Sequence, residues 1–415
     1  MVILLKNPYV SRKLLLFNKF TCPTTNTTNY FTIILLNCLK GVIHIMKIIC
    51  SKSNLLKGVN IVAKAVPSKT TMAILECILI DCTTGNIKLT ANDMELGIET
   101  NIEGEILEKG MIALDAKIFS EIVRKLPDND VIIETDASLQ TTITCEKAKF
   151  HICGKSGEDF SYLPYVERNE SIELSQFTLK DIISQTIFSI ADNENNKLMT
   201  GELFEIDGEH LKVVSLDGHR ISIRKVELKE SYAPKKVIVP GKTLQEISKI
   251  LSGDIESVVS IFFTSNHIVF EFDETTVVSR LIEGEYFRVN QMLSSDYETK
   301  VKVNKKEFLS CIDRATLLVK EGDKKPIIID IQDGEMELQI NSQLGSMKEN
   351  LDIQKEGKDI MIGFNPKFMI DALRVIDEEI VTLYMVNPKA PCFIKDEQES
   401  YTYLILPVNF NSVNR

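Results

Sequence analysis

The sequence lacks the short motifs that hold nucleotides, dinucleotides or zinc. It contains no P-loop, no GxGxxG after a strand and no cluster of metal ligands. Its nine cysteines form no CxxC and no Cys/His pair at zinc-finger spacing, and the nearest approach is Cys77 with Cys82. These absences argue against an enzyme that depends on a bound nucleotide or metal. They are typical of reduced thiols in a cytoplasmic protein.

Residues 1–45 lack acidic side chains altogether. They contain two apolar runs, both too short to span a bilayer. A basic, acid-free stretch with Ser, Thr and Asn is compatible with a signal or transit peptide. We favour a misassigned start or a disordered extension, because the first repeat begins with its own strand at Met46. The cations of this segment are Lys6, Arg12, Lys13, Lys19 and Lys40.

The sequence contains one pattern of strands and helices that occurs three times. The stretches MKIICSKSNLLKGVNIVAKAV from Met46, IELSQFTLKDIISQTIFSIA from Ile172 and KVKVNKKEFLSCIDRATLLV from Lys300 each read as a strand running into an amphipathic helix. Strand pairs follow, and each contains a glycine where a tight hairpin needs a positive backbone angle. These glycines are Gly85, Gly208 and Gly334.

A second helix in each copy carries two basic residues seven positions apart. Seven residues are nearly two helical turns, so both cations lie on one face, and the apolar residues between them lie on another. Each pair stands 125 residues beyond the previous one. The pairs are Lys117 with Arg124, Lys242 with Lys249, and Lys367 with Arg374.

A period near 125 residues is the size of an independent domain rather than of a solenoid repeat. The sequence therefore predicts an α+β fold of three repeated domains, each with two helices packed on antiparallel sheets. The predicted domains are 46–170, 171–299 and 300–415, after the extension 1–45. The predicted helices are 51–66, 115–126, 178–191, 241–251, 304–319 and 365–376.

The charge is divided unevenly between these helices and the rest of the chain. The formal net charge is −11, and without the extension 43 cations face 59 acids. The six helices nevertheless hold 14 Lys or Arg against 7 Asp or Glu. Any one basic pair is usually a solvated helix face. Three pairs in register favour a surface for a polyanion.

The spacing between packed helices determines how wide a hole they can surround. Six helices spaced about 9–10 Å apart close to an axis-to-axis diameter of only about 18 Å, which leaves no usable hole. Twelve helices give a diameter near 37 Å and a hole of roughly 25 Å, wide enough for a nucleic-acid duplex. A ring around a duplex therefore requires two chains, with the helices inside and the sheets outside.

The local sequence resembles that of a known family over residues 46–410. The most specific motif is SLDGHRIS, Ser215 to Ser222, in the second repeat, supported by KVIVPGKTLQEISKIL and by YLILPVNF at Tyr403–Phe410. These motifs are similar to those of the bacterial DNA polymerase III beta subunit, the replicative sliding clamp. The resemblance implies three clamp domains that form half of a ring, and a head-to-tail homodimer that encircles double-stranded DNA.

The resemblance also implies a role without catalysis, as a processivity factor in the cytoplasm at the nucleoid, without cofactor or metal. The helices are expected to contact phosphates without reading bases, so that the ring slides. Lys117, Lys367 and Arg374 share the repeat register with the DNA-binding candidates. Those candidates are Lys57, Lys64, Lys69, Arg124, Asn193, Lys197, Lys242 and Lys249.

A second implied site is an apolar cleft between the second and third domains. It is expected to receive short hydrophobic peptides from the replicative polymerase alpha subunit, the clamp loader, other polymerases and repair proteins. In EYFRVNQML (Glu285–Leu293), Phe287 replaces the family's proline and Met292 a smaller valine, which puts the preferred partner sequence in doubt. The cleft candidates are Met199, Leu216, Gly218, His219, Arg220, Ile221, Phe287, Gln291, Met292, Leu404, Leu406 and Pro407.

Two other classes of function stay open at this point. A protein scaffold that uses only the cleft would bind partner peptides but would not depend on the helix lysines for processive synthesis. An enzyme could use His219 as a general base, but only the turn residue Asp217 is predicted beside it, and no nucleophile is. A clamp, a scaffold and an enzyme therefore differ in what loss of the basic helix residues or of His219 should do.

Overall fold

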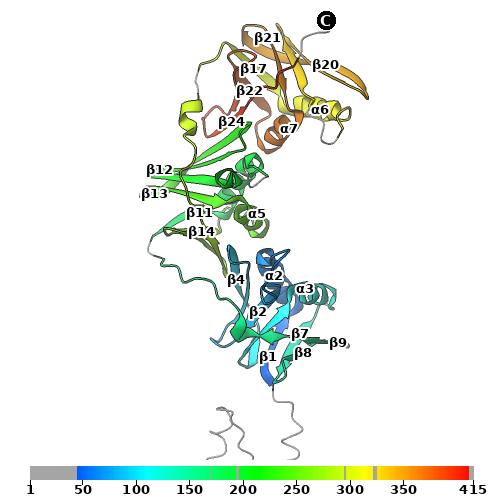
Figure 1. Cartoon of the computed structure of the whole chain (residues 1–415), viewed down its shortest axis with the longest axis vertical. Coiled ribbons are helices and arrows are strands. Elements are labelled where there is room, and N and C mark those ends of the chain that lie inside the picture. Colours follow the sequence, from blue (N-terminus) through cyan, green and yellow to red (C-terminus); the bar gives the residue numbers. More distant parts are fainter. Residues whose placement is uncertain (1–43, 169, 193–195, 294–295, 321–324, 411–415) are drawn as a thin grey trace, which may run out of the picture.

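The computed structural model describes residues 44–168, 170–192, 196–293, 296–320 and 325–410. Within these ranges the chain folds into three successive α+β units that follow one another along a bow (Figure 1). Two helices belong to each unit, so the predicted fold class is confirmed. The first strand begins at His44, two residues before the predicted start.

The first unit contains two helices, two 3₁₀ turns and ten strands within its described residues. They are β1 His44–Ser51, α2 Lys52–Val62, η2 Ala63–Ala65, β2 Cys77–Asp81, β3 Ile87–Asn92, β4 Leu96–Ile102, β5 Glu105–Glu108, β6 Met111–Asp115, α3 Ala116–Lys125, β7 Asp130–Asp136, β8 Gln140–Cys145, β9 Ala148–Cys153, β10 Lys155–Ser156 and η3 Gly157–Asp159.

Among the described residues of the second unit, two long strands lie between the helices, where the first unit has five shorter ones. Its elements are β11 Ser171–Ser175, α4 Gln176–Thr186, η4 Ile187–Ser189, η5 Lys197–Thr200, β12 Gly201–Leu216, β13 Arg220–Pro240, α5 Gly241–Ile250, β14 Val258–Phe263, β15 His267–Phe272, β16 Thr275–Arg280 and η6 Val289–Met292. Among the described residues of the third unit, four strands lie between the helices. Its elements are β17 Thr299–Asn304, α6 Lys305–Thr316, β18 Ile327–Ile331, β19 Glu335–Ser342, β20 Gly345–Gly357, β21 Ile360–Phe364, α7 Pro366–Val375, β22 Ile380–Met385, β23 Cys392–Lys395 and β24 Tyr401–Ile405.

The first helix of every unit begins with the same kind of N-cap. Ser51 accepts a hydrogen bond from the Asn54 amide at 3.1 Å, and Ser175 accepts one from the Thr178 amide at 3.0 Å. Asn304 does the same at the start of α6. Each cap satisfies a backbone N–H that the helix itself leaves unpaired, so the strand stops and the helix starts at these residues.

The hairpin glycines adopt the backbone angles that the sequence predicts. Gly85, Gly208 and Gly334 have φ values of +106°, +59° and +78°. A side chain is disfavoured in this region of φ, so glycine allows the turns to close.

Two of the three sheets run from one unit into the next. In the nine-stranded sheet, β4 of the first unit pairs antiparallel with β16 of the second. In the ten-stranded sheet, β13 of the second unit pairs antiparallel with β24 of the third. A five-stranded sheet in the order β5-β1-β7-β8-β9 belongs to the first unit alone. Strand pairing across both junctions joins the units into continuous sheets. The predicted domain boundaries at 170 and 299 therefore stay predictions.

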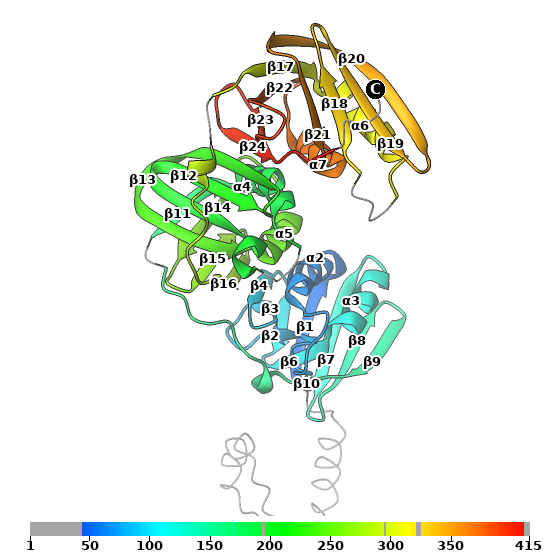
Figure 2. The same ribbon diagram turned by 45° about the horizontal axis from the view of Figure 1, so that its top comes forward.

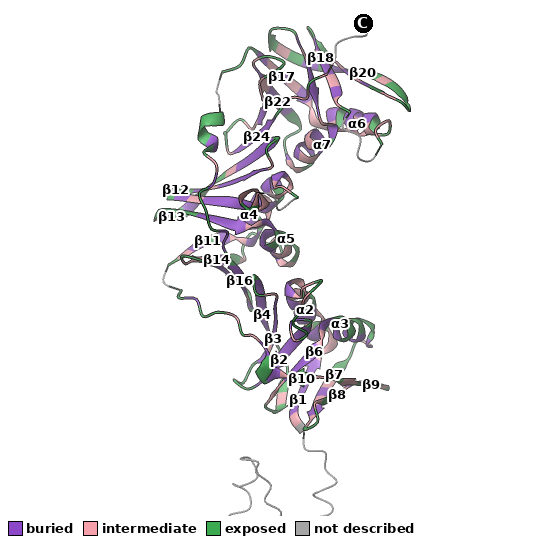
Figure 3. Ribbon diagram, viewed as in Figure 1, coloured by how far each residue is buried: buried purple, intermediate pink, exposed green. Residues whose placement is uncertain are grey.

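The sheets and helices divide the bow into two sides. Figures 1 and 2 show the helices of all three units on the same side, and the ends of β12 and β13 on the other. Buried residues follow the sheets and the inner faces of the helices (Figure 3). The helices cover the sheets with apolar residues such as Phe119, Leu244 and Leu373, all fully buried. Their opposite faces are therefore free to carry charge.

Candidate nucleic-acid face and docking cavity

The basic helix of each unit buries an apolar stripe and exposes its cations. In α3, Phe119 and Val123 are buried, while Lys117 and Arg124 are exposed. In α5, Leu244 and Ile247 are buried and the two lysines are exposed in the same way. The third copy, α7, exposes Lys367 and Arg374. Spacing by seven thus places both cations of a helix on its outer face.

The remaining cations predicted to bind DNA lie nearby in sequence but on different elements. Lys57 is exposed on α2, and Lys64 is half-buried on the 3₁₀ turn that follows it. Lys69 is exposed in the bend after that turn, and Lys197 is exposed at the start of η5. Asn193 lies outside the described residues.

Carboxylates offset several of these charges. Glu121 pairs with Arg124, and its pKa is lowered by the hydrogen bond from that guanidinium. Glu246 lies 2.8 Å from Lys249. Lys242 reaches across a domain junction to Asp93.

Other helix cations have no such neighbour. In the part of the chain that the structure describes, Lys57, Lys64 and Lys117 have no carboxylate within 4.0 Å. Lys69, Lys197 and Lys367 are likewise without an ion-pair partner there. The face is therefore basic but only moderately so, which is a surface suited to weak, non-specific contact with phosphates.

An apolar cavity of about 460 Å³ lies where the second and third units meet. Ten of the twelve residues predicted for the cleft line it. Its walls come from η5, the turn between β12 and β13, the segment around η6, and the end of β24. The ten are Met199, Leu216, Gly218, His219, Arg220, Ile221, Phe287, Met292, Leu404 and Leu406.

The DGHR turn contributes Gly218, His219 and Arg220 to the lining of this cavity. Asp217 accepts hydrogen bonds from the backbone amides of His219 and Arg220 at 2.9 and 3.1 Å. Gly218 takes a φ of +88°, so its place in the turn suits glycine. The turn therefore presents His219 and Arg220 to the cavity from a fixed backbone.

Arg220 brings a positive charge to this largely apolar lining. Its side chain is 7% exposed and lies 3.0 Å from Asp217 and 2.7 Å from Asp371 of α7. Burial by itself lowers the pKa of Arg220, but the hydrogen bond to Asp371 and the neighbouring carboxylates raise it overall. The guanidinium also stacks over the Phe368 ring, 4.3 Å from its centre. The cation is thus fully paired, as burial requires.

Two predicted cleft residues are not part of this cavity, and one lining residue was not predicted. Gln291 lines a separate hollow of about 710 Å³ on the other side of Phe287. Pro407 follows β24 without reaching the lining. Pro391, in the loop between β22 and β23, does line the cavity. Only the pairing of β23 with β24 brings this loop close, and no local sequence signal indicates it.

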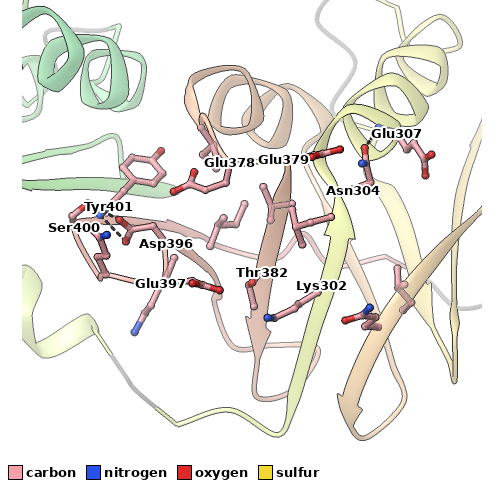
Figure 4. A pocket seen from close by; sticks show the side chains of 18 of the residues that line it. Lys302, Asn304, Glu307, Glu378, Glu379, Thr382, Asp396, Glu397, Ser400 and Tyr401 are labelled. Carbon is pink, nitrogen blue, oxygen red and sulfur yellow. Dashed lines mark hydrogen bonds between the residues drawn. The ribbon is translucent and has the colours of Figure 1, made fainter. Parts of the chain in front are cut away.

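A larger hollow of about 1080 Å³ lies on the third unit and has a different character (Figure 4). Lys302 and Thr382 lie on its strands, with Glu378 and Glu379 at its edge. Asp396 is held by the backbone amide of Tyr401 at 3.0 Å. Charged and polar side chains are mixed with apolar ones in this lining, whereas the lining of the cavity near Arg220 is mostly apolar.

The thiols of Cys50, Cys82, Cys311 and Cys392 are buried, and burial raises the pKa of each to about 12. They are therefore protonated packing residues rather than nucleophiles.

No helix within the described ranges is long and apolar enough to cross a membrane.

Three α+β units joined edge to edge, with their helices on one side, define the DNA-clamp class of fold. Family models match the chain in three consecutive parts: DNA polymerase III beta subunit, N-terminal domain, at residues 46–164; central domain at 173–287; and C-terminal domain at 290–409. The chain belongs to the DNA polymerase III beta subunit family, the bacterial sliding clamps.

Similar proteins support this assignment over most of the chain. A beta sliding clamp from Staphylococcus aureus (strain Mu50) is 36% identical over 356 residues, which cover 83% of this chain and 94% of the relative. A crystal structure of a putative DNA polymerase III beta subunit from Eubacterium rectale is 76% identical, with a TM-score of 0.85. The sliding clamp from Bacillus subtilis is 32% identical, also with a TM-score of 0.85. Each structural comparison covers 88% of this chain and 100% of the other.

Proposed function

We propose that two copies of this chain form a closed ring around duplex DNA and act as the processivity factor of the replicative polymerase. The ring catalyses no reaction itself. It works in the cytoplasm, at the nucleoid, and holds DNA by enclosure, with the helices facing the duplex and the sheets outside.

The observation that carries this proposal is that both junctions inside the chain are built alike. At each, the edge strand of one unit's part of the shared sheet pairs antiparallel with the last strand of the next unit: β4 with β16, and β13 with β24. In the third unit the strand equivalent to β4 and β13, and in the first unit the strand equivalent to β16 and β24, have no such partner within the described part of the chain. They are the first half of β20, Gly345–Leu351, and β9.

Both leftover strands have an open edge in the described part of the chain. The first half of β20 pairs only with β19, and β9 pairs only with β8. An open strand edge offers backbone donors and acceptors to another chain. A second copy placed head to tail supplies the missing partner at both ends, so two more junctions of the same kind close a ring of six units.

The helix face supports weak contact with the DNA. Exposed cations such as Lys57 and Lys117 can reach phosphates, whereas Arg124 and Lys249 already have carboxylate neighbours. Phosphate contacts carry no sequence information, so the ring can slide. Affinity for linear DNA should be poor and should fall further as salt rises.

The apolar cavity supports docking of short partner peptides from the polymerase, the clamp loader and repair proteins. Its volume of about 460 Å³ lies in the usual range for ligand sites. Met199 and Met292 can adapt to different apolar anchors. A sliding clamp from Bartonella birtlesii, 25% identical to this chain, was solved bound to griselimycin, which makes that compound a useful competitor.

The ring is tested by topology. Clamp loaded onto nicked circular DNA should stay with the DNA during gel filtration and should leave it within minutes after a restriction enzyme opens the circle. Blocking both ends of the linear DNA with bound protein should restore retention. Equal loss from circular and linear DNA would rule out enclosure.

A further inference from the structure

One carboxylate occupies the same place in the basic helix of all three repeats. Glu121, Glu246 and Asp371 stand 125 residues apart, and each precedes a cation by three positions. In α3 the carboxylate pairs with that cation, Arg124, and in α5 it pairs with Lys249. This is the pairing that neighbours on one helix face normally make.

The third copy is different. Asp371 turns away from α7's own cation and accepts a hydrogen bond from Nη1 of Arg220, in the preceding unit, at 2.7 Å. Arg374 lies instead 3.6 Å from Asp313 of α6. The carboxylate therefore pairs within its own helix in two repeats, whereas in the third repeat it forms an ion pair between two units.

Arg220 has contacts to both sides of the junction. Its Nε donates to Asp217 at 3.0 Å, and its Nη2 donates to the carbonyl of Phe188, both in the second unit. Its guanidinium carbon lies 5.4 Å from the ring centre of Phe188 and 4.3 Å from that of Phe368. Asp371 and Phe368 are its partners in the third unit.

The same arginine lines the docking cavity, whose walls come from both units. Leu216 and His219 form part of the wall from the second unit, and Leu404 and Leu406 belong to the third. Strand pairing between β13 and β24 fixes the backbones of these walls, with Ile221 opposite Leu404. The side chain of Arg220 adds a second, charged attachment to α7 beneath the cavity.

We propose that Asp371 is a positioning residue for the docking cavity: it holds the Arg220 guanidinium in place across the junction and so sets the two walls of the cavity for a partner peptide. Asp371 does not line the cavity. The inference rests on the proposed docking function of this cavity. Without Asp371, the buried cation keeps only Asp217 as a counter-charge and is expected to shift toward it or toward water.

The test compares the three equivalent carboxylates in the full-length chain. Binding is measured by fluorescence anisotropy with a short fluorescein-labelled peptide that carries one Leu and one Phe anchor, and griselimycin serves as competitor. Asp371→Asn should weaken peptide binding about tenfold or more. The matched controls Glu121→Gln and Glu246→Gln, at the same helix position, should leave peptide affinity unchanged.

A second comparison separates positioning from general loss of stability. Arg220→Lys should weaken binding to a similar extent, and the double variant Arg220→Lys/Asp371→Asn should be little worse than either single variant, because both act through one contact. Asp371→Glu keeps the charge and should retain most of the affinity. It also provides a folded variant should Asp371→Asn not fold.

The outcomes distinguish this inference from the proposed function. Unchanged affinity of Asp371→Asn, or losses that add up in the double variant, would overturn the role of Asp371 while docking in the cavity stands. Failure of the unaltered chain to bind either the peptide or griselimycin would overturn docking itself, and the positioning role with it.

Discussion

Thr100 of β4 and Thr275 of β16 face each other across the first junction, with their hydroxyl oxygens 2.9 Å apart. Both residues are almost fully buried, at 3% and 4% exposure. They belong to different units, 175 positions apart in sequence. The junction is therefore the interior of a continuous sheet, with its own paired polar groups, and not a contact between two finished surfaces.

This pair predicts an asymmetric response to mutation. Thr100→Val should destabilise the chain by about 1–3 kcal/mol, because the hydroxyl of Thr275 then stays buried without a partner. The double variant Thr100→Val/Thr275→Val should recover most of that loss. Urea unfolding measures the free energies, and Thr142→Val, at a solvent-exposed cross-strand pair with His151, serves as the control. Purely additive losses would contradict the coupling.

The predicted junction between two copies can be broken at β9. Phe150 lies opposite the buried Ile143 but is itself 38% exposed at the open edge, where a second copy would cover it. Phe150→Asp should weaken the dimer about 100-fold or more, as expected for a central apolar contact. Analytical ultracentrifugation across a concentration series would show the shift to monomer.

The control for this experiment is Phe177→Asp. Phe177 is 53% exposed on α4, away from β9 and β20, so the same chemical change should leave the dimer intact. If Phe150→Asp remains dimeric at concentrations where the unaltered chain is dimeric, then β9 does not form the junction.

Local patterns predicted much of the fold. The hairpin glycines and the apolar stripes of the helices act within a few residues, so they are visible in the sequence. The resemblance also brought together ten residues that the structure places around one cavity. Their role in binding peptides stays a prediction.

Contacts between distant parts of the chain could not be predicted in the same way. The sequence shows the same carboxylate spacing in all three basic helices, so nothing in it separates Asp371 from Glu121. Only the packing of α7 against the DGHR turn gives Asp371 a different partner. The pair Lys242–Asp93 and the position of Pro391 likewise depend on how the units meet.

Cations without a carboxylate neighbour should contribute more to DNA binding than cations that are already in ion pairs. Lys57→Ala should weaken binding of the chain to linear duplex DNA at low salt more than Arg124→Ala does, because Arg124 is already paired with Glu121. Glu121→Gln should strengthen that binding, since it releases a cation. Lys229→Ala, an exposed lysine on β13, is the control for loss of charge elsewhere. Equal effects of Lys57→Ala and Lys229→Ala would contradict a DNA-facing helix surface.

The cavity predicts a variant that separates the two proposed activities. Leu406→Asp places a charge in the apolar lining and should weaken binding of the Leu/Phe peptide at least tenfold, because a carboxylate loses its water there. Retention on circular DNA should be unchanged once the ring is loaded. Ile255→Asp, at a residue 66% exposed and outside the cavity, is the matched control. Equal peptide binding by both variants would place docking elsewhere.

Glu202 predicts how stability depends on pH. It is fully buried on β12, and burial raises its pKa to about 8, although a hydrogen bond from Thr186 at 3.1 Å acts in the opposite direction. Its other oxygen, Oε1, has no hydrogen-bond partner among the described residues. The folded chain therefore keeps this carboxyl protonated at pH values where the unfolded chain has released the proton.

Since the folded pKa lies above the unfolded value of about 4.3, this group's contribution is fully present below that pH and is lost as pH rises toward 8. The free energy of unfolding should fall by about 1.4 kcal/mol per pH unit in that window from this group alone. Glu202→Gln, which stays neutral, should remove that slope in urea unfolding between pH 5 and 8. Glu209→Gln, at an exposed glutamate of the same strand, should keep it. Parallel curves for Glu202→Gln and the unaltered chain would show that Glu202 is already ionised in the folded state.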